Sequence, residues 1–226
     1  MALVELLTKL TLAPALVVLA TLSARRWGDA IGGIVIAIPV VAGPILLVLG
    51  LEQGVGFVHH AARAAVLGIV AVGAFCVACG RCLHLGWVIA IGVGWLVYGL
   101  TAVALTVVDA TVWICLGAAL AAIAVARRLT PAPPSATFNA AGPPAWDLPA
   151  RAAATAALVV ALTGAASALG PSLSGLLTPF PLATSVVIAF TLSQAGEAAA
   201  AHALRGYLTG LPGLAGFCLL VALLTQ

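Results

Sequence analysis

Charged side chains are scarce in this sequence, since Asp, Glu, Lys and Arg together make up 7% of its 226 residues. A soluble domain carries about 25% charged residues, because its surface faces water. A chain that is 64% hydrophobic cannot cover a globule of this size with polar groups. The shortage of charge therefore excludes a soluble globular fold and predicts an integral membrane protein.

Several other patterns are missing. The two-residue alternation of apolar and polar side chains that is typical of a membrane β-barrel does not occur, so the protein is predicted to be all-α. No basic run is interleaved with aromatic residues, so no nucleic-acid partner is expected. No Ser/His/Asp arrangement, zinc-protease motif, phosphate-binding loop or pair of catalytic carboxylates is found. We therefore expect no catalytic residue, no enzyme activity and no cofactor.

Cysteine is also infrequent. Five cysteines, an odd number lying mostly in apolar runs, argue against a secreted framework of disulfides. The run CVACGRCLH has a spacing that would suit a metal or redox site, with Cys76, Cys79, Cys82 and His84 as its members. Packing is the favoured interpretation, because Cys76 has a counterpart in Cys218, in the repeat described below, where no second cysteine follows. No metal site is expected.

Long apolar runs predict about eight transmembrane helices, because a helix needs roughly 20 apolar residues to cross a bilayer. The expected spans cover residues 3–22, 30–51, 57–79, 84–105, 110–126, 151–168, 172–193 and 200–224. A Pro-rich stretch separates the fifth and sixth spans and is interpreted as a linker. The predicted organisation is a first repeat of three helices (1–80), two connecting helices (81–128), a cytoplasmic linker (129–150) and a second repeat of three helices (151–226).

The basic residues predict the orientation, because cytoplasmic loops carry an excess of Lys and Arg. With the N-terminus outside, the outer side holds only Lys9 and Arg63, and the inner side holds seven arginines. These are Arg25, Arg26, Arg81, Arg127, Arg128, Arg151 and Arg205. Both termini are therefore expected outside the cytoplasm. Asp29 is expected to be a helix-start acid, favoured by the helix dipole.

The chain contains an internal repeat. A shift of 142 positions aligns residues 9–76 with 151–218 without a gap, and scarce residues coincide in this frame. They include Pro39 with Pro181, His60 with His202, Arg63 with Arg205, and FC at 75–76 with FC at 217–218. Five spans separate a helix from its counterpart, so the two copies are expected to have inverted topology. Inverted repeats are frequent in secondary transporters, whose copies rock about a site near the midplane.

Prolines interrupt the second span of each copy: Pro39 and Pro44 in the first, Pro179 and Pro181 in the second. Proline removes a helical hydrogen bond, and in lipid the freed carbonyl needs a partner such as a hydroxyl. Thr178, Thr184 and Ser185 offer hydroxyls in the second copy. Matched interruptions in both halves indicate a transport site, and structural kinks without a ligand are the alternative.

A polar phrase follows each interrupted span: EQGVGFVHHAAR at 52–63 and QAGEAAAAHALR at 194–205. In each, a His lies three residues before an Arg, so the two share one helix face. His changes charge near neutral pH, and Arg binds carboxylate or phosphate. We expect these clusters to gate an anion or relay a proton, through Glu52, Gln53, His60, Arg63, Gln194, Glu197, His202 and Arg205. Interfacial side chains at helix ends are the alternative.

The second copy, from about Arg151 to Leu224, resembles the GlpM family of small bacterial inner-membrane proteins. The matching residues are SGLLTPFP at 174–181, and a Gly followed by an acidic residue in GEAAAAHALR at 196–205. The first copy keeps GGIVIAIP and EQG. The family has been linked to envelope polysaccharide production. The resemblance implies a fused, inverted double of one such unit in the bacterial inner membrane, and it supplies no catalytic residue.

Two functions are compatible with these patterns. The first is a small inverted-repeat secondary transporter, with proton coupling as an option, for an anionic metabolite or a lipid-linked envelope precursor. The second is a non-transporting membrane scaffold of an envelope polysaccharide or lipid assembly system. The expected partners are the lipid bilayer, the anionic substrate or precursor and, as an option, a second copy of the chain.

Overall fold

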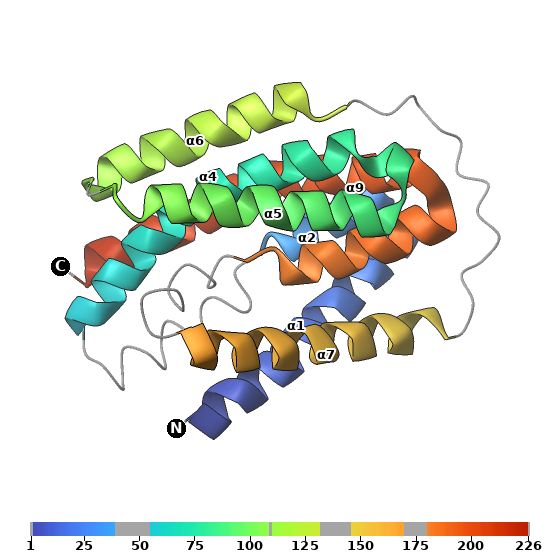
Figure 1. The fold of residues 1–226 in the computed structure, drawn as a ribbon, viewed down its shortest axis with the longest axis horizontal. Helices are drawn as coiled ribbons and strands as arrows, with labels where there is room; N and C mark the ends of the chain where they lie inside the picture. The colour runs from blue at the N-terminus through green and yellow to red at the C-terminus, as the bar shows by residue number, and fades with distance from the viewer. Residues whose placement is uncertain (1, 39–54, 109, 132–145, 170–179, 226) are drawn as a thin grey trace.

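A computed structural model describes the protein over residues 2–38, 55–108, 110–131, 146–169 and 180–225. The side chains of 2–10, 55–58, 60–61 and 162–169 lie outside that description. Within these ranges the chain forms helices and no strand, which confirms the all-α prediction. The helices lie alongside one another in an elongated bundle (Figure 1).

The described chain has seven α-helices and one short 3₁₀ turn, η1 (Leu83–Leu85). The α-helices are α1 (Ala2–Trp27), α2 (Asp29–Ile36), α4 (Val55–Arg81), α5 (Trp87–Leu105), α6 (Val112–Leu129), α7 (Asp147–Leu169) and α9 (Leu182–Leu224). Four of them, α4, α5, α6 and α9, are long and apolar enough to cross a membrane. This composition agrees with a membrane-embedded protein, and the count of eight spans stays a prediction.

Helix α9 consists of two arms. Gly196 has φ 84° and ψ −176°, far from helical values, and separates the arms. Glycine adopts a positive φ at little cost because it has no Cβ. The first arm (182–195) runs to one end of the bundle and the second arm (197–224) runs back (Figure 1). These arms overlap the expected spans 172–193 and 200–224.

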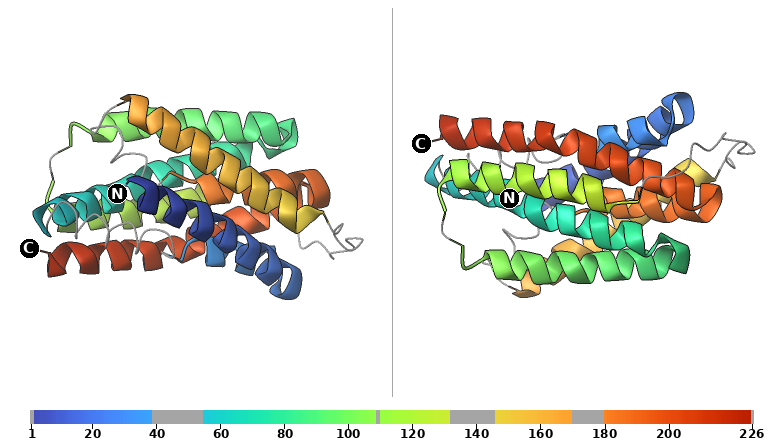
Figure 2. Two further views of the ribbon diagram at one scale, coloured as in Figure 1. Left: turned by 90° about the horizontal axis from the view of Figure 1, so that it is seen from below. Right: turned by 90° about the horizontal axis from the view of Figure 1, so that it is seen from above.

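Seven arginines gather at one end of the bundle, here called the arginine end. Helices α1, α4 and α6 all finish there, as does the bend of α9, while both chain termini lie toward the opposite end (Figures 1 and 2). Arg25, Arg26, Arg81, Arg127 and Arg128 occupy the last turns of these helices. Arg151 and Arg205 join them through contacts with Asp147 and Thr130. The arginines that the sequence assigned to one side therefore lie together, and which side faces the cytoplasm stays a prediction.

Helices that are counterparts in the sequence repeat pack against each other: α1 contacts α7, and α4 contacts α9. Five side chains of these two helices are fully buried in the hydrophobic core: Val66, Ile69, Phe75, Leu204 and Leu208. Lipid tails are as apolar as these side chains, so close van der Waals packing, rather than removal from water, holds such helices together.

Helix α2 lies directly on the second arm of α9. A Cβ placed on Gly33 would overlap the backbone of Ala203 and Tyr207, and one placed on Gly206 would overlap that of Ala30. Only glycine allows two backbones to approach so closely. The contact places Asp29, the first residue of α2, near the part of α9 that carries His202.

The structure describes only part of each second span of the repeat, because residues 39–51 of the first and 172–179 of the second lie outside the described residues. Helix α2 has 8 residues and rises about 12 Å, well short of the ~30 Å apolar core of a bilayer. It ends at Ile36, three residues before Pro39. Helix α9 begins at Leu182, directly after Pro181. Each described segment thus stops or starts near the proline that the repeat aligns.

Helix α7 begins earlier than expected. The sequence placed its first residue at Arg151, whereas the helix starts at Asp147, inside the expected linker. Pro149 allows this because proline is tolerated in the first turn of a helix, where its missing N–H has no partner to lose. The four added residues bring Asp147 into the folded bundle.

Candidate functional site

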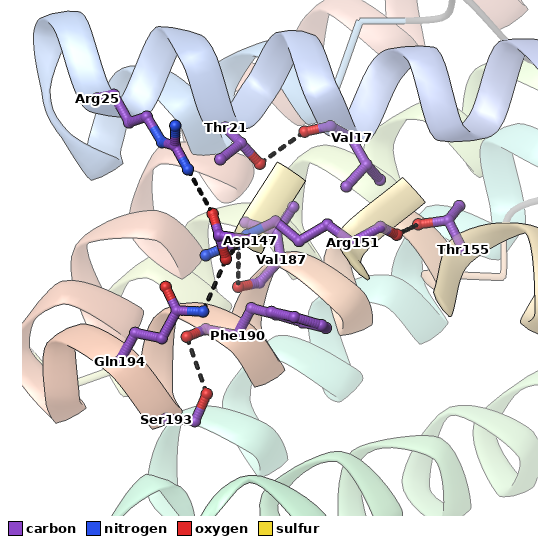
Figure 3. Close-up of polar contacts among 10 residues, drawn as sticks. All are labelled: Val17, Thr21, Arg25, Asp147, Arg151, Thr155, Val187, Phe190, Ser193 and Gln194. Atoms are coloured by element: carbon purple, nitrogen blue, oxygen red, sulfur yellow. Dashed lines mark hydrogen bonds and ion pairs between the residues drawn. The ribbon is translucent and has the colours of Figure 1, made fainter. Parts of the chain in front are cut away.

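Asp147 is the centre of a buried ion network that joins three helices (Figure 3). Its Oδ2 accepts a hydrogen bond from Arg25 Nη2 at 2.7 Å. Its Oδ1 accepts from Arg151 Nε at 2.8 Å and from Gln194 Nε2 at 2.7 Å. Asp147 and Arg151 are buried, at 0% and 5% exposed. An ionised group inside a helical membrane bundle is costly, so such a network is a functional-site candidate.

Each member reaches the network because of its place on its helix. Arg25 is in the last turn of α1, Asp147 is in the first turn of α7, and Gln194 ends the first arm of α9. Arg151 is four residues after Asp147, so the two lie on one face of α7. The guanidinium of Arg151 also lies 5.0 Å from the ring centroid of Phe190. The side chains of all three helices meet at the arginine end.

The network carries one net positive charge, from two arginines and one carboxylate. Burial alone would raise the pKa of Asp147. The hydrogen bonds from Arg151 and Gln194, the charge of Arg151 and the bond from Arg25 outweigh burial, so this pKa is lowered from 3.8. Asp147 therefore stays ionised at neutral pH and acts as a fixed anchor rather than a proton carrier.

Asp29 is a second carboxyl group close to the network, and it has the opposite tendency. Burial raises its pKa above 3.8, and the nearby His202 and Arg151 oppose that increase. Asp29 is in the first turn of α2, as the sequence predicted for a helix-start acid. Asp29 belongs to the first copy of the repeat and these two neighbours to the second, and among the carboxyl groups that the structure describes, Asp29 is the one whose pKa is raised.

An apolar groove of about 380 Å³ adjoins the network. Its walls come from α5, α7 and the first arm of α9, and three tryptophans line it: Trp87, Trp95 and Trp146. Gln194 and Ser193 provide polar groups at the arginine end of the groove. From Gln194 back to Ser185 the arm rises about 14 Å, so the groove extends from the polar network into the apolar part of the bundle.

The end of the groove farther from the ion network is lined by Trp95 and Ser185, which contact each other. Trp95 Nε1 donates to Ser185 Oγ at 2.8 Å, and this hydroxyl donates to the carbonyl oxygen of Pro181 at 2.6 Å. Phe180 packs on Trp95 and Tyr98, with ring centroids 5.4 Å and 5.2 Å apart. The Trp95 indole N–H is thereby satisfied, which leaves an apolar surface that suits a hydrocarbon chain.

Some of the residues singled out from the sequence meet at this groove. Ser185 and Gln194 line it, and Pro181 begins the helix that forms one wall. Thr184 is buried on the first arm of α9. Four expected site residues, Pro39, Pro44, Glu52 and Gln53, and the side chain of His60, lie outside the described residues.

The paired arginines of the polar phrase contact opposite ends of one helix. Arg63 Nη1 donates to the carbonyl oxygen of Ala110 at 3.0 Å, just before α6 begins. Arg205 Nη1 donates to that of Thr130 at 3.1 Å, where α6 ends.

The other members of the second phrase lie apart from the groove. His202 is half-buried, and its Nδ1 lies 2.9 Å from the carbonyl oxygen of Ala198, while Glu197 is exposed. The described members of the two polar phrases therefore do not form a single cluster. Their arginines bind the ends of α6, Gln194 joins the ion network, and His202 lies near Asp29.

Sequence reasoning did not select the residue at the centre of the site. Asp147 was assigned to the linker, and Arg25 and Arg151 were explained by topology alone. The spacing of Asp147 and Arg151, four residues apart and of opposite charge, is a helical signal that indicates an ion pair. The partnership of Asp147 with Arg25, 122 residues away, has no local signal.

The cysteines form no site in the described chain. All five are free, and four of them, Cys76, Cys79, Cys115 and Cys218, are buried. Cys76, Cys79 and Cys218 belong to the hydrophobic core of the bundle. Among the described residues no group of three His, Cys, Asp or Glu side chains is arranged to hold a metal ion.

Comparison with known proteins gives no match for this chain among family models, curated proteins or solved structures. The resemblance of its second copy to the GlpM family stays a prediction from the quoted motif.

Proposed function

We propose that this protein is a small secondary transporter of the bacterial inner membrane that moves an anionic, lipid-linked precursor. The observation that carries the proposal is the double role of Gln194. Its amide donates to Asp147 in the ion network, and the same side chain lines the aromatic groove. A substrate with an anionic head and an apolar chain is complementary to both parts at once.

The charge of the network favours an anionic head group. Two arginines share one carboxylate, which leaves one positive charge unmatched within the network. Arg25 is its accessible cation, with 30% of its side chain exposed against 1% for Asp147. A guanidinium binds phosphate through paired hydrogen bonds. A small water-soluble anion would make no use of the groove, so a lipid-linked precursor is preferred to a metabolite.

An inverted repeat of 9–76 and 151–218 is part of the proposal. Two observations support it besides the aligned residues. Helices α1 and α7 pack together, as do α4 and α9, so counterparts are neighbours. The aligned residues Arg63 and Arg205 bind carbonyl groups at opposite ends of α6, as a two-fold axis near the middle of that helix would require.

These arginine contacts are the proposed gates. In a transporter with alternating access, one end of the substrate path opens while the other stays closed. Arg63 holds the start of α6 and Arg205 holds its end. Release of one contact at a time would free one end of α6, while the other arginine keeps the opposite end in place.

Proton coupling is assigned to Asp29. It faces His202 on α9 and Arg151 on α7, and Arg151 in turn belongs to the network at the proposed head-group site. Protonation of Asp29 would leave the positive charge near the head group less compensated, and so favour an anion. Substrate and proton would thereby bind together.

Reconstitution in liposomes tests the proposal. The probe is phosphatidic acid with a short fluorescent NBD-acyl chain, and the zwitterionic control is phosphatidylcholine with the same chain. Dithionite added outside quenches probe in the outer leaflet, so the slow loss of protected fluorescence measures movement across the membrane. We expect the protein to speed movement of the anionic probe at least tenfold over empty liposomes, and to speed it further when the pH gradient drives protons with it.

Matched arginine variants locate the site. Arg25→Gln should slow the anionic probe strongly, because Arg25 is the accessible cation of the network. Arg26→Gln is the control, since the neighbouring Arg26 stacks on Trp27 at 5.5 Å instead. Equal movement of both probes would overturn selectivity for anions. Binding of the anionic probe without movement would favour the scaffold function.

A further inference from the structure

A second groove, of about 410 Å³, lies between α4, α5 and α6 and shares no lining residue with the aromatic groove. Most of its wall is made of small or β-branched apolar side chains. Its smallest lining residues are Gly73, Ala74, Ala78, Ala122 and Ala126, and its one charged lining residue is Arg81. The proposed transport path does not use this groove.

The length of the groove matches one leaflet of a bilayer. Along α4 it extends from Val70 to Arg81, a rise of about 16 Å. This is close to half of the ~30 Å apolar core of a membrane. A chain that enters beside Arg81 would therefore end near the middle of the bilayer, as one acyl chain of a phospholipid does.

Arg81 lines the groove at the arginine end, and two more arginines that do not line it lie in the neighbouring end of α6. Arg81 is in the last turn of α4, and Arg127 and Arg128 are in the last turn of α6. Gly80 packs against Thr130 and Pro131, so these two helix ends are in contact. All three arginines are exposed, and within the described part of the chain none of them makes an ion pair or a hydrogen bond.

We propose that this groove binds an anionic phospholipid of the leaflet at the arginine end, with an acyl chain along α4 and the phosphate at the three arginines. Basic pockets between transmembrane helices bind anionic head groups. Among the residues that the structure describes, no carboxylate lines the groove, so no described group in its wall competes for the cations. A neutral lipid would fill the apolar part and leave the arginines unmatched.

A second copy of the chain fits this surface less well than a lipid. Small residues do allow helices to pack closely in a membrane. In a dimer whose two-fold axis runs along the membrane normal, however, Arg81, Arg127 and Arg128 of both copies would meet at one level. Six like charges would then face one another without a carboxylate in the groove wall, which charge repulsion disfavours.

Native mass spectrometry of the delipidated full-length protein tests the site. Phosphatidylglycerol and phosphatidylcholine with identical acyl chains are added in a neutral detergent. We expect the wild type to bind phosphatidylglycerol at least tenfold more tightly. The triple variant Arg81→Gln/Arg127→Gln/Arg128→Gln should bind it roughly a hundredfold more weakly than the wild type. Arg26→Gln, at the same end but away from this groove, should bind as the wild type does.

A groove-filling variant separates the chain from the charges. Ala122→Leu adds bulk to a half-buried lining residue and should weaken phosphatidylglycerol binding while all three arginines remain. Equal affinity for the two lipids, or wild-type binding by the triple variant, would overturn the proposal. A lipid-free dimer that Ala122→Leu dissociates would overturn it too, and would assign the groove to a second copy. Unchanged thermal melting shows that each variant is folded.

Discussion

Asp147 receives three hydrogen bonds from side chains on three helices, so the geometry of the ion network depends on this one residue. Its two oxygens separate the charges of Arg25 and Arg151, which would otherwise repel each other. The carboxylate also forms the ion pair of the buried Arg151 guanidinium, and a buried cation requires a counter-ion.

Asp147→Asn should therefore destabilise the protein strongly. The substitution leaves Arg151, 5% exposed, as a buried cation without its carboxylate, and removing one partner of a buried pair costs about 3–5 kcal/mol. Tryptophan fluorescence during heating in detergent measures the fall in Tm. The double variant Asp147→Asn/Arg151→Gln should recover part of the loss. A single variant that melts like the wild type would contradict the buried network.

Asp29 should make stability depend on pH. Its folded-state pKa is raised above 3.8, so the folded state holds the proton more tightly than the unfolded state does. The resulting stabilisation is full below about pH 3.8 and is lost as pH rises through the folded pKa. The Tm of the wild type relative to Asp29→Asn should thus fall as pH rises above about 3.8.

Asp147 supplies the control for that experiment, because its pKa is lowered. Its stabilisation is present above pH 3.8 and is lost only as pH falls through its folded pKa. The Tm of the wild type relative to Asp147→Asn should therefore stay high at neutral pH and shrink in acid. If the Tm differences from Asp29→Asn and from Asp147→Asn changed in the same direction with pH, the assigned pKa directions would be contradicted.

At the residue scale, the sequence predicted side chains with local signals and missed those with distant partners. Ser185 was selected as a hydroxyl close to Pro181, and Gln194 as a member of the second polar phrase. Both line the aromatic groove. Arg63 and Arg205 were selected as a pair, but the carbonyl groups that they bind lie 47 and 75 residues away. Periodicity and spacing carry no information about contacts over such separations.

The close contact between α2 and α9 belongs to the scale of whole elements. Helix α2 has only 8 residues, so its position depends on how closely it can approach the second arm of α9. Gly33 and Gly206 face each other's helix backbone in that contact. The pair therefore fixes both the position of α2 and the distance from Asp29 to His202.

Gly206→Ala should separate the two helices and destabilise the protein. The new Cβ would overlap the carbonyl group of Ala30, and overpacking typically costs about 1–3 kcal/mol. Gly216→Ala on the same arm is the matched control, because nothing lies within 4 Å of its Cβ position. In a helix that change alone should be neutral or stabilising by about 0.5–1 kcal/mol. Equal Tm shifts for the two variants would contradict the close approach.

Element boundaries were predictable where a breaker or a basic last turn marked them. Gly86 precedes α5, and Arg127 and Arg128 lie in the last turn of α6. The start of α7 was placed too late, because Pro149 and the prolines before it read as linker rather than as a first helical turn. No residue in the sequence marked the end of α2 at Ile36, since the apolar run continues past Pro39.

For the whole molecule, orientation in the membrane is the testable property. The arginine end should face the cytoplasm, since Lys and Arg are enriched on that side. Of the native cysteines, Cys82 is half-buried and the others are buried, so Cys82→Ser gives a suitable background. In that background Asn139→Cys should resist a membrane-impermeant thiol reagent in intact cells and react after permeabilisation. Labelling of residue 139 in intact cells would reverse the orientation and remove the basis for inversion.

The separation of Arg25 and Asp147 by 122 residues has a consequence for biosynthesis. Helix α1 leaves the ribosome long before the codon for Asp147 is read, so Arg25 has no counter-ion in the network until 122 further residues have been added. The ion pair forms only when α7 arrives and covers α1. A chain that stops before Asp147 keeps that face of α1 open and its arginine unmatched. The complete network therefore forms only after α1, α7 and the first arm of α9 have all been made and inserted.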